Sequence, residues 1–124
     1  MRKVKRPSAR YLKYKEEARK LVRIKLLYWS EIYGFKYGKV AIRNQKTRWG
    51  SCSKRVNLNF SYKIVFLPEH LVDYLIVHEL CHLEQFNHSK DFWALVGKTI
   101  PDYQKRRNEL RHMVQLTNTK VLNK

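Results

Sequence analysis

The sequence is short of several kinds of residue, and each shortage excludes a class of protein. Its 124 residues include two cysteines, Cys52 and Cys81, which could form at most one bridge and so exclude a disulfide-built scaffold. The four glycines and three prolines form no linker, and the chain has no internal repeat. No apolar run approaches the roughly 18 residues that a membrane-spanning helix needs.

The N-terminal segment does not predict a cleaved secretory signal. Its basic residues lead into no apolar stretch of the kind found in secretory signals. Together these absences predict a cytoplasmic protein with reduced cysteines, built as a single domain over residues 1–124.

Acidic residues are scarce as well, and unevenly so. The chain has 27 Lys and Arg residues against 10 Asp and Glu residues, a formal net charge of +17. Residues 1–67 contain 19 basic and three acidic residues, whereas residues 68–124 contain eight basic and seven acidic residues. The basic half is therefore predicted to attract polyanions, with nucleic acid or an acidic membrane as candidate partners. A merely solubilising face would have the same composition.

The sequence does contain enough apolar residues to form a core. Hydrophobic residues make up 44% of the chain and aromatic residues 13%, which excludes a disordered basic tail. Apolar residues recur at helical spacing from Tyr14 to Ile32, after a suitable N-cap at Ser8 and before Gly34. This pattern predicts one long helix over residues 9–33.

The stretch over residues 39–62 changes to the alternation typical of strands. It predicts a small, three-stranded, mainly antiparallel sheet, in which Trp49–Ser53 forms a hairpin with the following strand around a tip at Lys54–Arg55. Three helices are expected after the sheet, over 68–85, 90–98 and 101–116. The ends, 1–8 and 117–124, are expected to be flexible. The predicted fold class is α+β, with the helix over 68–85 at its centre because that segment is apolar on most sides.

The central predicted helix contains an H-E-x-x-H motif, His78-Glu79-Leu80-Cys81-His82. Residues four apart lie on one face of a helix, so both imidazoles can reach one Zn²⁺ ion. Glu79 can take a proton from zinc-bound water and pass it to a leaving amine. The alternative is a pair of hydrogen-bonded core histidines. Three polar residues on an otherwise buried helix are more easily explained by a metal.

A catalytic zinc site needs a third protein ligand, for which we favour His88. On an unbroken helix His88 would lie about 240° around from His82, so the helix must end between them. Asn87 tolerates the left-handed conformation that such an ending uses, and Ser89 can cap the next helix. The alternative third ligands are carboxylates of the following helices: Asp91, Asp102 and Glu109.

Several motifs between residues 39 and 110 combine in a specific way. They are Thr47-Arg48-Trp49-Gly50-Ser51-Cys52-Ser53, Asn57-Leu58-Asn59, Pro68, Tyr74, the His78–His82 motif with Leu83, Asn87-His88-Ser89 and Phe92-Trp93. In this combination the chain resembles the YgjP-like metallopeptidases, relatives of the SprT-like and minimal gluzincin-type zinc peptidases. The resemblance implies a zincin-like fold with His78, His82 and His88 on one zinc ion and Glu79 as general base. It also implies residues that shape or support the cleft: Trp49, Gly50, Cys52, Phe92 and Trp93.

Three functions remain open from the sequence. The leading one is a monomeric, zinc-dependent metallohydrolase that acts on a protein or peptide, with Arg48 and Trp49 as candidate contacts to an oxyanion or to substrate. The second is a zinc-dependent nucleotide pyrophosphohydrolase, because a cationic cleft beside a metal also suits phosphoanhydrides. The third is a basic nucleic-acid-binding module with a structural zinc ion, which would have no use for Glu79.

Overall fold

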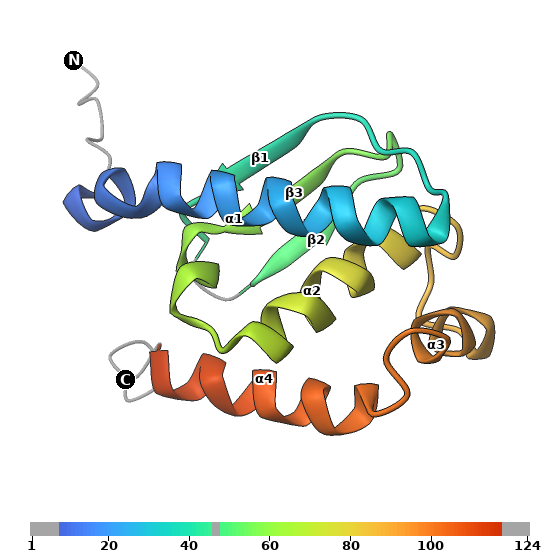
Figure 1. Cartoon of the computed structure of the whole chain (residues 1–124). Coiled ribbons are helices and arrows are strands. Elements are labelled where there is room, and N and C mark those ends of the chain that lie inside the picture. The colour runs from blue at the N-terminus through green and yellow to red at the C-terminus, as the bar shows by residue number, and fades with distance from the viewer. Residues whose placement is uncertain (1–7, 46–47, 118–124) are drawn as a thin grey trace, which may run out of the picture.

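The computed structural model describes residues 8–45 and 48–117 and places helices around a small three-stranded sheet (Figure 1). Its elements in chain order are α1 (Ala9–Tyr33), β1 (Val40–Arg43), β2 (Gly50–Cys52), β3 (Leu58–Ser61), the 3-10 helix η1 (Tyr62–Phe66), α2 (Glu69–Cys81), α3 (Lys90–Gly97) and α4 (Tyr103–Thr117). This is the α+β class that the sequence predicts. The sequence analysis missed η1 and placed the start of α4 two residues too early.

Helix α1 has the bounds that its sequence predicts. The Ser8 side chain accepts a hydrogen bond from the backbone N–H of Tyr11 at 3.0 Å, which satisfies one free donor of the first turn. At the other end Gly34 adopts the left-handed conformation, with φ of 72°, that ends many helices. Ala18, Val22 and Leu26 lie four residues apart on the buried face.

The sheet is mixed rather than mainly antiparallel. β3 is the central strand, parallel to β1 and antiparallel to β2. The predicted hairpin between β2 and β3, with its turn at Lys54–Arg55, is confirmed. The parallel pair follows from the strand order. β1 and β2 lie at opposite edges of the sheet, and the hairpin after β2 places β3 between them. β2 is consequently an edge strand.

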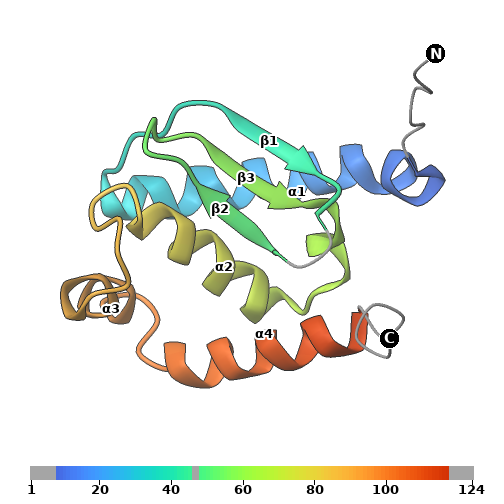
Figure 2. The same ribbon diagram turned by 180° about the vertical axis from the view of Figure 1, so that it is seen from behind.

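Helices pack on one face of the sheet, and α2 lies at the centre of the molecule. Figure 2 shows the strands in front of α1, with α2 beside β2 and α4 beyond α2. The core lies between these layers and includes Leu58 and Phe60 of β3 and Ile76 and Leu80 of α2, all fully buried. Burial on nearly every side explains why the sequence of α2 is apolar all round.

A polar contact ties α1 to α2. The Trp29 indole N–H donates to Asp73 Oδ1 at 3.0 Å, and Lys25 Nζ lies 2.9 Å from the same oxygen. Lys25 also pairs with Glu69 at the start of α2. Trp29 therefore supports the packing of α1 on α2.

Helix α2 ends earlier than the sequence predicts. It stops at Cys81 and continues as turns, in which the N–H of Gln85 donates to the carbonyl of Cys81 at 2.9 Å. The prediction of a left-handed conformation at Asn87 is wrong. Among the described non-glycine residues, Val56 alone has a positive φ, of 59°. Consecutive turns with hydrogen bonds between residues three apart, such as Leu83 N–H to the carbonyl of Leu80, thus end this helix in place of a left-handed cap.

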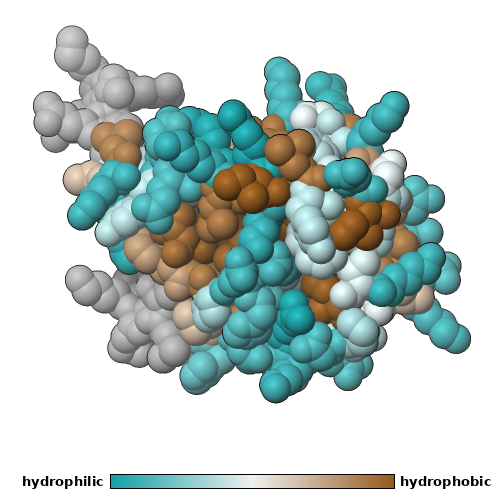
Figure 3. Space-filling model, viewed as in Figure 1, coloured by the Kyte–Doolittle hydropathy of each residue, from teal (hydrophilic) through white to brown (hydrophobic). Residues whose placement is uncertain are grey.

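The surface over α1 is amphipathic. Figure 3 shows brown apolar side chains between teal polar ones on the face that carries α1, where Leu12, Ile24, Leu27, Tyr28 and Ile32 are exposed. No helix within the described residues is long and apolar enough to cross a membrane. The ends predicted to be flexible fall almost wholly outside the described residues, and of them only Ser8 and Thr117 are placed, as the cap of α1 and the last residue of α4.

Candidate metal centre

Three histidine side chains converge at the end of α2. His78 lies in the last turn of α2, His82 follows as its C-cap, and His88 lies in the segment before α3. Their Nε2 atoms are separated by 3.3 Å (His78 to His82), 3.0 Å (His82 to His88) and 3.2 Å (His88 to His78). Within the described part of the chain these three residues form one group with metal-ligating geometry.

The geometry fits a tetrahedral zinc ion. Two nitrogen ligands at about 2.0–2.1 Å from such an ion lie about 3.3 Å apart. Hydrogen bonds cannot account for all three contacts, because a neutral imidazole has one N–H. Each Nε2 is then either a donor or an acceptor, so two of the three must be alike. In His82 that hydrogen is on Nδ1, since Nδ1 lies 3.1 Å from the carbonyl oxygen of Gln85, which can only accept. The lone pair of His82 Nε2 therefore points into the cluster.

The start of α3 brings His88 to the other two histidines. Ser89 caps α3, as the sequence predicts, by accepting a hydrogen bond from the N–H of Phe92. The Phe92 ring stacks on His82 with centroids 4.4 Å apart, and the Trp93 ring stacks on His88 at 5.7 Å. Both aromatic residues thus support the ligand rings.

The carboxylates considered as alternative third ligands lie outside this group. Glu109 Oε2 is 2.8 Å from His70 Nε2, and Asp102 pairs with Arg106 at 3.1 Å. Asp91 is exposed in the first turn of α3. The structure therefore favours His88 over all three carboxylates.

The surroundings keep the histidines neutral, which is the form that binds a metal. Burial, and then the neighbouring His82, His88 and Arg107, together lower the pKa of His78 to about 3. Burial likewise lowers the pKa of His82 and of His88. None of the rings needs to lose a proton before it binds a cation at neutral pH.

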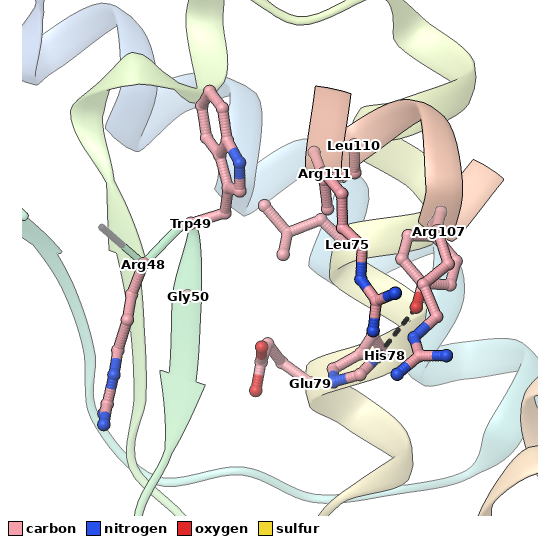
Figure 4. Close-up of a pocket in the computed structure, with 10 residues that line it drawn as sticks. Arg48, Trp49, Gly50, Leu75, His78, Glu79, Arg107, Leu110 and Arg111 are labelled. Carbon is pink, nitrogen blue, oxygen red and sulfur yellow. Dashed lines mark hydrogen bonds between the residues drawn. The ribbon is translucent and has the colours of Figure 1, made fainter. Parts of the chain in front are cut away.

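Glu79 lies next to the histidines and points from α2 toward β2 (Figure 4). Its side chain is buried, with 4% exposure, and burial raises its pKa to about 8. The positive charge of Arg48 acts against this rise. A carboxylate of raised pKa is a stronger base than one in water, which suits proton transfer near neutral pH.

Two cavities meet at His78 and Glu79. One, which we call the metal-side cavity, has a volume of about 340 Å³ and is lined by all three histidines and by β2. The other, of about 210 Å³, lies between β2, α2 and α4, and its lining is drawn in Figure 4. Arg48, itself exposed, lines both cavities, whereas Trp49, only 8% exposed, lines the second.

The family of the chain follows from its sequence profile. The family model described as "YgjP-like, metallopeptidase domain" matches residues 3–113. The chain belongs to the YgjP-like metallopeptidase family. The resemblance seen in the sequence motifs is thereby confirmed.

A solved structure supports the same conclusion for the fold. The metallopeptidase zymogen abylysin of Pyrococcus abyssi superposes on the YgjP-like chain with a TM-score of 0.69. The sequences are 27% identical, and the match covers 76% of this chain and 95% of abylysin. No curated protein matches the chain significantly.

Cys52 lines the metal-side cavity of the YgjP-like domain but is poorly suited to react. Burial, with a smaller contribution from the negative charge of Glu79, raises the pKa of its thiol to about 11. A protonated thiol is a poor nucleophile and a poor metal ligand. This agrees with a supporting role for Cys52 in the cleft.

Gly50 allows β2 to approach Glu79 closely. A Cβ atom at this position would lie 3.0 Å from the carbonyl oxygen of Asn59, 3.2 Å from the Phe60 ring and 3.3 Å from Cγ of Glu79. We expect Gly50→Ala to displace Glu79 and to lower the free energy of unfolding by about 1–3 kcal/mol, measured by urea denaturation.

Gly97 provides the matched control for that substitution. A Cβ at Gly97 meets nothing nearer than the Tyr103 ring at 3.5 Å, an ordinary contact. Because alanine favours helices over glycine by about 1 kcal/mol, Gly97→Ala in α3 should leave stability unchanged or raise it. Equal losses in both variants would contradict the close approach at Gly50.

Tyr74 holds His78 from one turn earlier in α2. Its hydroxyl oxygen lies 3.2 Å from His78 Nδ1. In the tautomer that binds a metal through Nε2, the Nδ1 hydrogen is donated to this hydroxyl. We expect Tyr74→Phe to lower zinc affinity about 10–100-fold, measured by competition with a chromogenic chelator. Tyr11→Phe, which removes a hydroxyl donating to the Ile42 carbonyl, should bind zinc as the unaltered chain does. Equal zinc affinity of the two variants would exclude this role for Tyr74.

The sequence analysis missed two arginines beside the site. Arg107 and Arg111 of α4 line the second cavity together with Tyr74, Leu75 and Leu110. Their spacing of four residues places them on one face of a helix, but nothing local shows that this face meets α2. The position of Tyr74 beside the site is easier to predict from the sequence than that of the two arginines, because Tyr74 precedes His78 by four residues on the same helix face.

Proposed function

We propose that this chain is a zinc-dependent peptidase in which His78, His82 and His88 hold one zinc ion and Glu79 is the general base. The convergence of the three Nε2 atoms beside a buried carboxylate is the observation that carries this proposal. Membership of a metallopeptidase family supports it. We further propose that the chain acts as one domain and as a monomer.

The ligand set favours a catalytic over a structural zinc ion. Structural zinc sites are closed by four protein ligands, whereas catalytic sites have three and an open position. The described residues offer three ligand atoms at this centre. The open position would face the metal-side cavity, so a nucleic-acid-binding module with structural zinc is disfavoured.

Each residue then has a defined role in hydrolysis. Zinc, when bound, acts as a Lewis acid that polarises the scissile carbonyl and makes water a better nucleophile. Glu79 accepts the proton of the attacking water and passes it to the leaving amine nitrogen. His78, His82 and His88 stay neutral throughout, while Tyr74, Phe92 and Trp93 fix their orientation. Arg48 keeps the Glu79 carboxyl closer to its ionised form.

The position of β2 favours a peptide as substrate. β2 is an edge strand, and Gly50, Ser51 and Cys52 line the same cavity as the histidines. An extended peptide can add to the free edge of a strand by backbone hydrogen bonds. Such an arrangement would place a peptide carbonyl between β2 and the three histidines.

A substrate panel tests the proposal. Zinc-loaded protein is incubated in parallel with an unfolded casein-type protein and with nucleoside triphosphates, and products are followed by mass spectrometry. We expect new peptide termini, lost with a chelator and restored by zinc. Hydrolysis of triphosphates without peptide cleavage would favour the pyrophosphohydrolase instead. Tight, steeply salt-dependent DNA binding without any hydrolysis would favour the nucleic-acid module.

A further inference from the structure

The cavity of about 210 Å³ beside His78 carries positive charge that the proposed chemistry does not use. We call it the arginine pocket; its lining includes Arg107, Arg111, Trp49, Leu75 and Leu110. Both arginines extend from α4, and Figure 4 shows their side chains reaching toward His78. The pocket therefore opens directly beside the centre that we propose to be catalytic.

Neither arginine of the pocket has a carboxylate partner in the part of the chain that the structure describes. Among the described residues, the ion pairs of α4 belong to Arg106, with Asp102, and to Glu109, with His70. Arg107 instead stacks on the Trp93 ring, with its guanidinium carbon 5.0 Å from the ring centroid. Stacking fixes the plane of the guanidinium and leaves its N–H groups free to bind an anion.

Trp49 adds a third donor without a partner. Its side chain is 8% exposed, and its buried Nε1 has no hydrogen-bond acceptor among the described residues. In Figure 4 the nitrogen edge of the indole faces Leu75 and Arg111. A buried N–H without an acceptor is unfavourable, so its direction indicates where an acceptor belongs.

We propose that the arginine pocket binds a carboxylate of the substrate, either an acidic side chain or a free C-terminal carboxylate next to the cleaved bond. This inference rests on the proposed peptidase function. A carboxylate is planar and accepts paired N–H donors from a guanidinium, and it has oxygens left for the indole N–H. His78 and Glu79 line this pocket and the metal-side cavity, so the bound residue would adjoin the bond being cut.

The size and walls of the pocket favour an amino-acid residue over a nucleotide. Sites for whole small molecules usually enclose about 300–1,000 Å³, more than the 210 Å³ here. Leu75, Leu110 and the Trp49 ring provide apolar walls that suit the methylene groups of a side chain. A triphosphate carries several hydrated charges, and part of it would have to lie against these apolar walls.

Binding to an inactive form tests the proposal apart from turnover. Zinc-loaded Glu79→Gln protein is titrated calorimetrically with short peptides of two kinds of matched pair, whose members differ only in one carboxylate. One pair compares Glu with Gln at a single internal position, scanned along the peptide, and the other compares a free C-terminus with its amide. We expect the carboxylate member of at least one pair to bind about tenfold more tightly. The pair that shows the preference identifies which carboxylate is recognised.

Arginine variants then test whether Arg107 and Arg111 cause the tighter binding of the carboxylate peptide. In the same background, Arg107→Gln and Arg111→Gln should each reduce the tenfold preference to less than about threefold. Lys105→Gln removes one positive charge from an exposed position of α4 and should leave the preference intact. This control separates a bound carboxylate from a general effect of net charge.

The arginine pocket would be overturned by equal affinities within both kinds of peptide pair, or by a preference that survives in both arginine variants. Tighter binding of a nucleoside triphosphate than of any peptide, lost in those variants, would overturn it as well. The proposed peptidase function fails separately. Cleavage without a carboxylate preference refutes only the pocket, and a carboxylate preference without cleavage by the unaltered protein refutes only the peptidase.

Discussion

The Glu79→Gln variant is expected to bind zinc as the unaltered chain does and to lose nearly all hydrolytic activity. The amide has nearly the size of the carboxylate, so the packing against Gly50 is kept. It cannot accept a proton from the attacking water. Loss of a general base lowers rates by about 10²–10⁴-fold, and kcat should fall by at least that factor. Zinc content is measured by atomic absorption and turnover on the peptide substrate found in the panel.

Glu84→Gln is the control for this substitution. Glu84 is exposed in the turns after α2 and contributes no side chain to the cavities beside His78. The control should bind zinc and cleave substrate at the rate of the unaltered chain. Full turnover by the Glu79→Gln variant would remove Glu79 from the mechanism. Loss of zinc in that variant would instead give Glu79 a role in holding the ion.

The second large effect is expected from His88→Ala. Removing one of three ligands should weaken zinc binding by more than about 100-fold, the upper range for loss of a residue that merely orients a ligand. His88 is exposed, so the substitution leaves the apolar core intact and the protein should still fold. Zinc affinity is measured by chelator competition, and folding by circular dichroism.

His70→Ala is matched to that variant. His70 is also exposed, but its Nε2 lies 2.8 Å from Glu109, away from the three converging rings. Zinc affinity should be unchanged in this control. If His88→Ala retained its zinc while Glu109→Gln or Asp102→Asn lost it, the third ligand would be one of the carboxylates that the sequence left open.

The parts of the structure that depend on local sequence are those that could be predicted. Ser8 and Gly34 mark the ends of α1 because capping involves residues within one turn of the helix end. The spacing of His78 and His82 places both on one face of α2. Their proximity needs no information about the rest of the fold.

Features that depend on contacts between distant segments could not be predicted in this way. The parallel pairing of β1 with β3 is set by which edge the chain reaches after β1, and strand alternation is the same in either orientation. The end of α2 at Cys81 follows from turns that position His82 and His88, whereas apolar periodicity continues beyond it. Asn87 had a suitable conformational preference, but the turns made a left-handed residue unnecessary.

The charge distribution shows the same limit. The excess of basic residues lies in residues 1–67, so the sequence analysis assigned the attraction of anions to that half. Arg107 and Arg111 belong to that remainder, yet they lie beside His78 because α4 packs on α2. Which charges lie at the site therefore depends on the packing of α4 on α2, which charge counting along the sequence does not show.

A zinc titration of the metal-free protein, with peptide cleavage followed at each addition, tests the central claim most directly. The account predicts no cleavage without metal, a rise in rate in proportion to added zinc, and a plateau at one zinc ion per chain. Cleavage by the metal-free protein would contradict it. So would stoichiometric zinc binding without cleavage of any peptide in the panel.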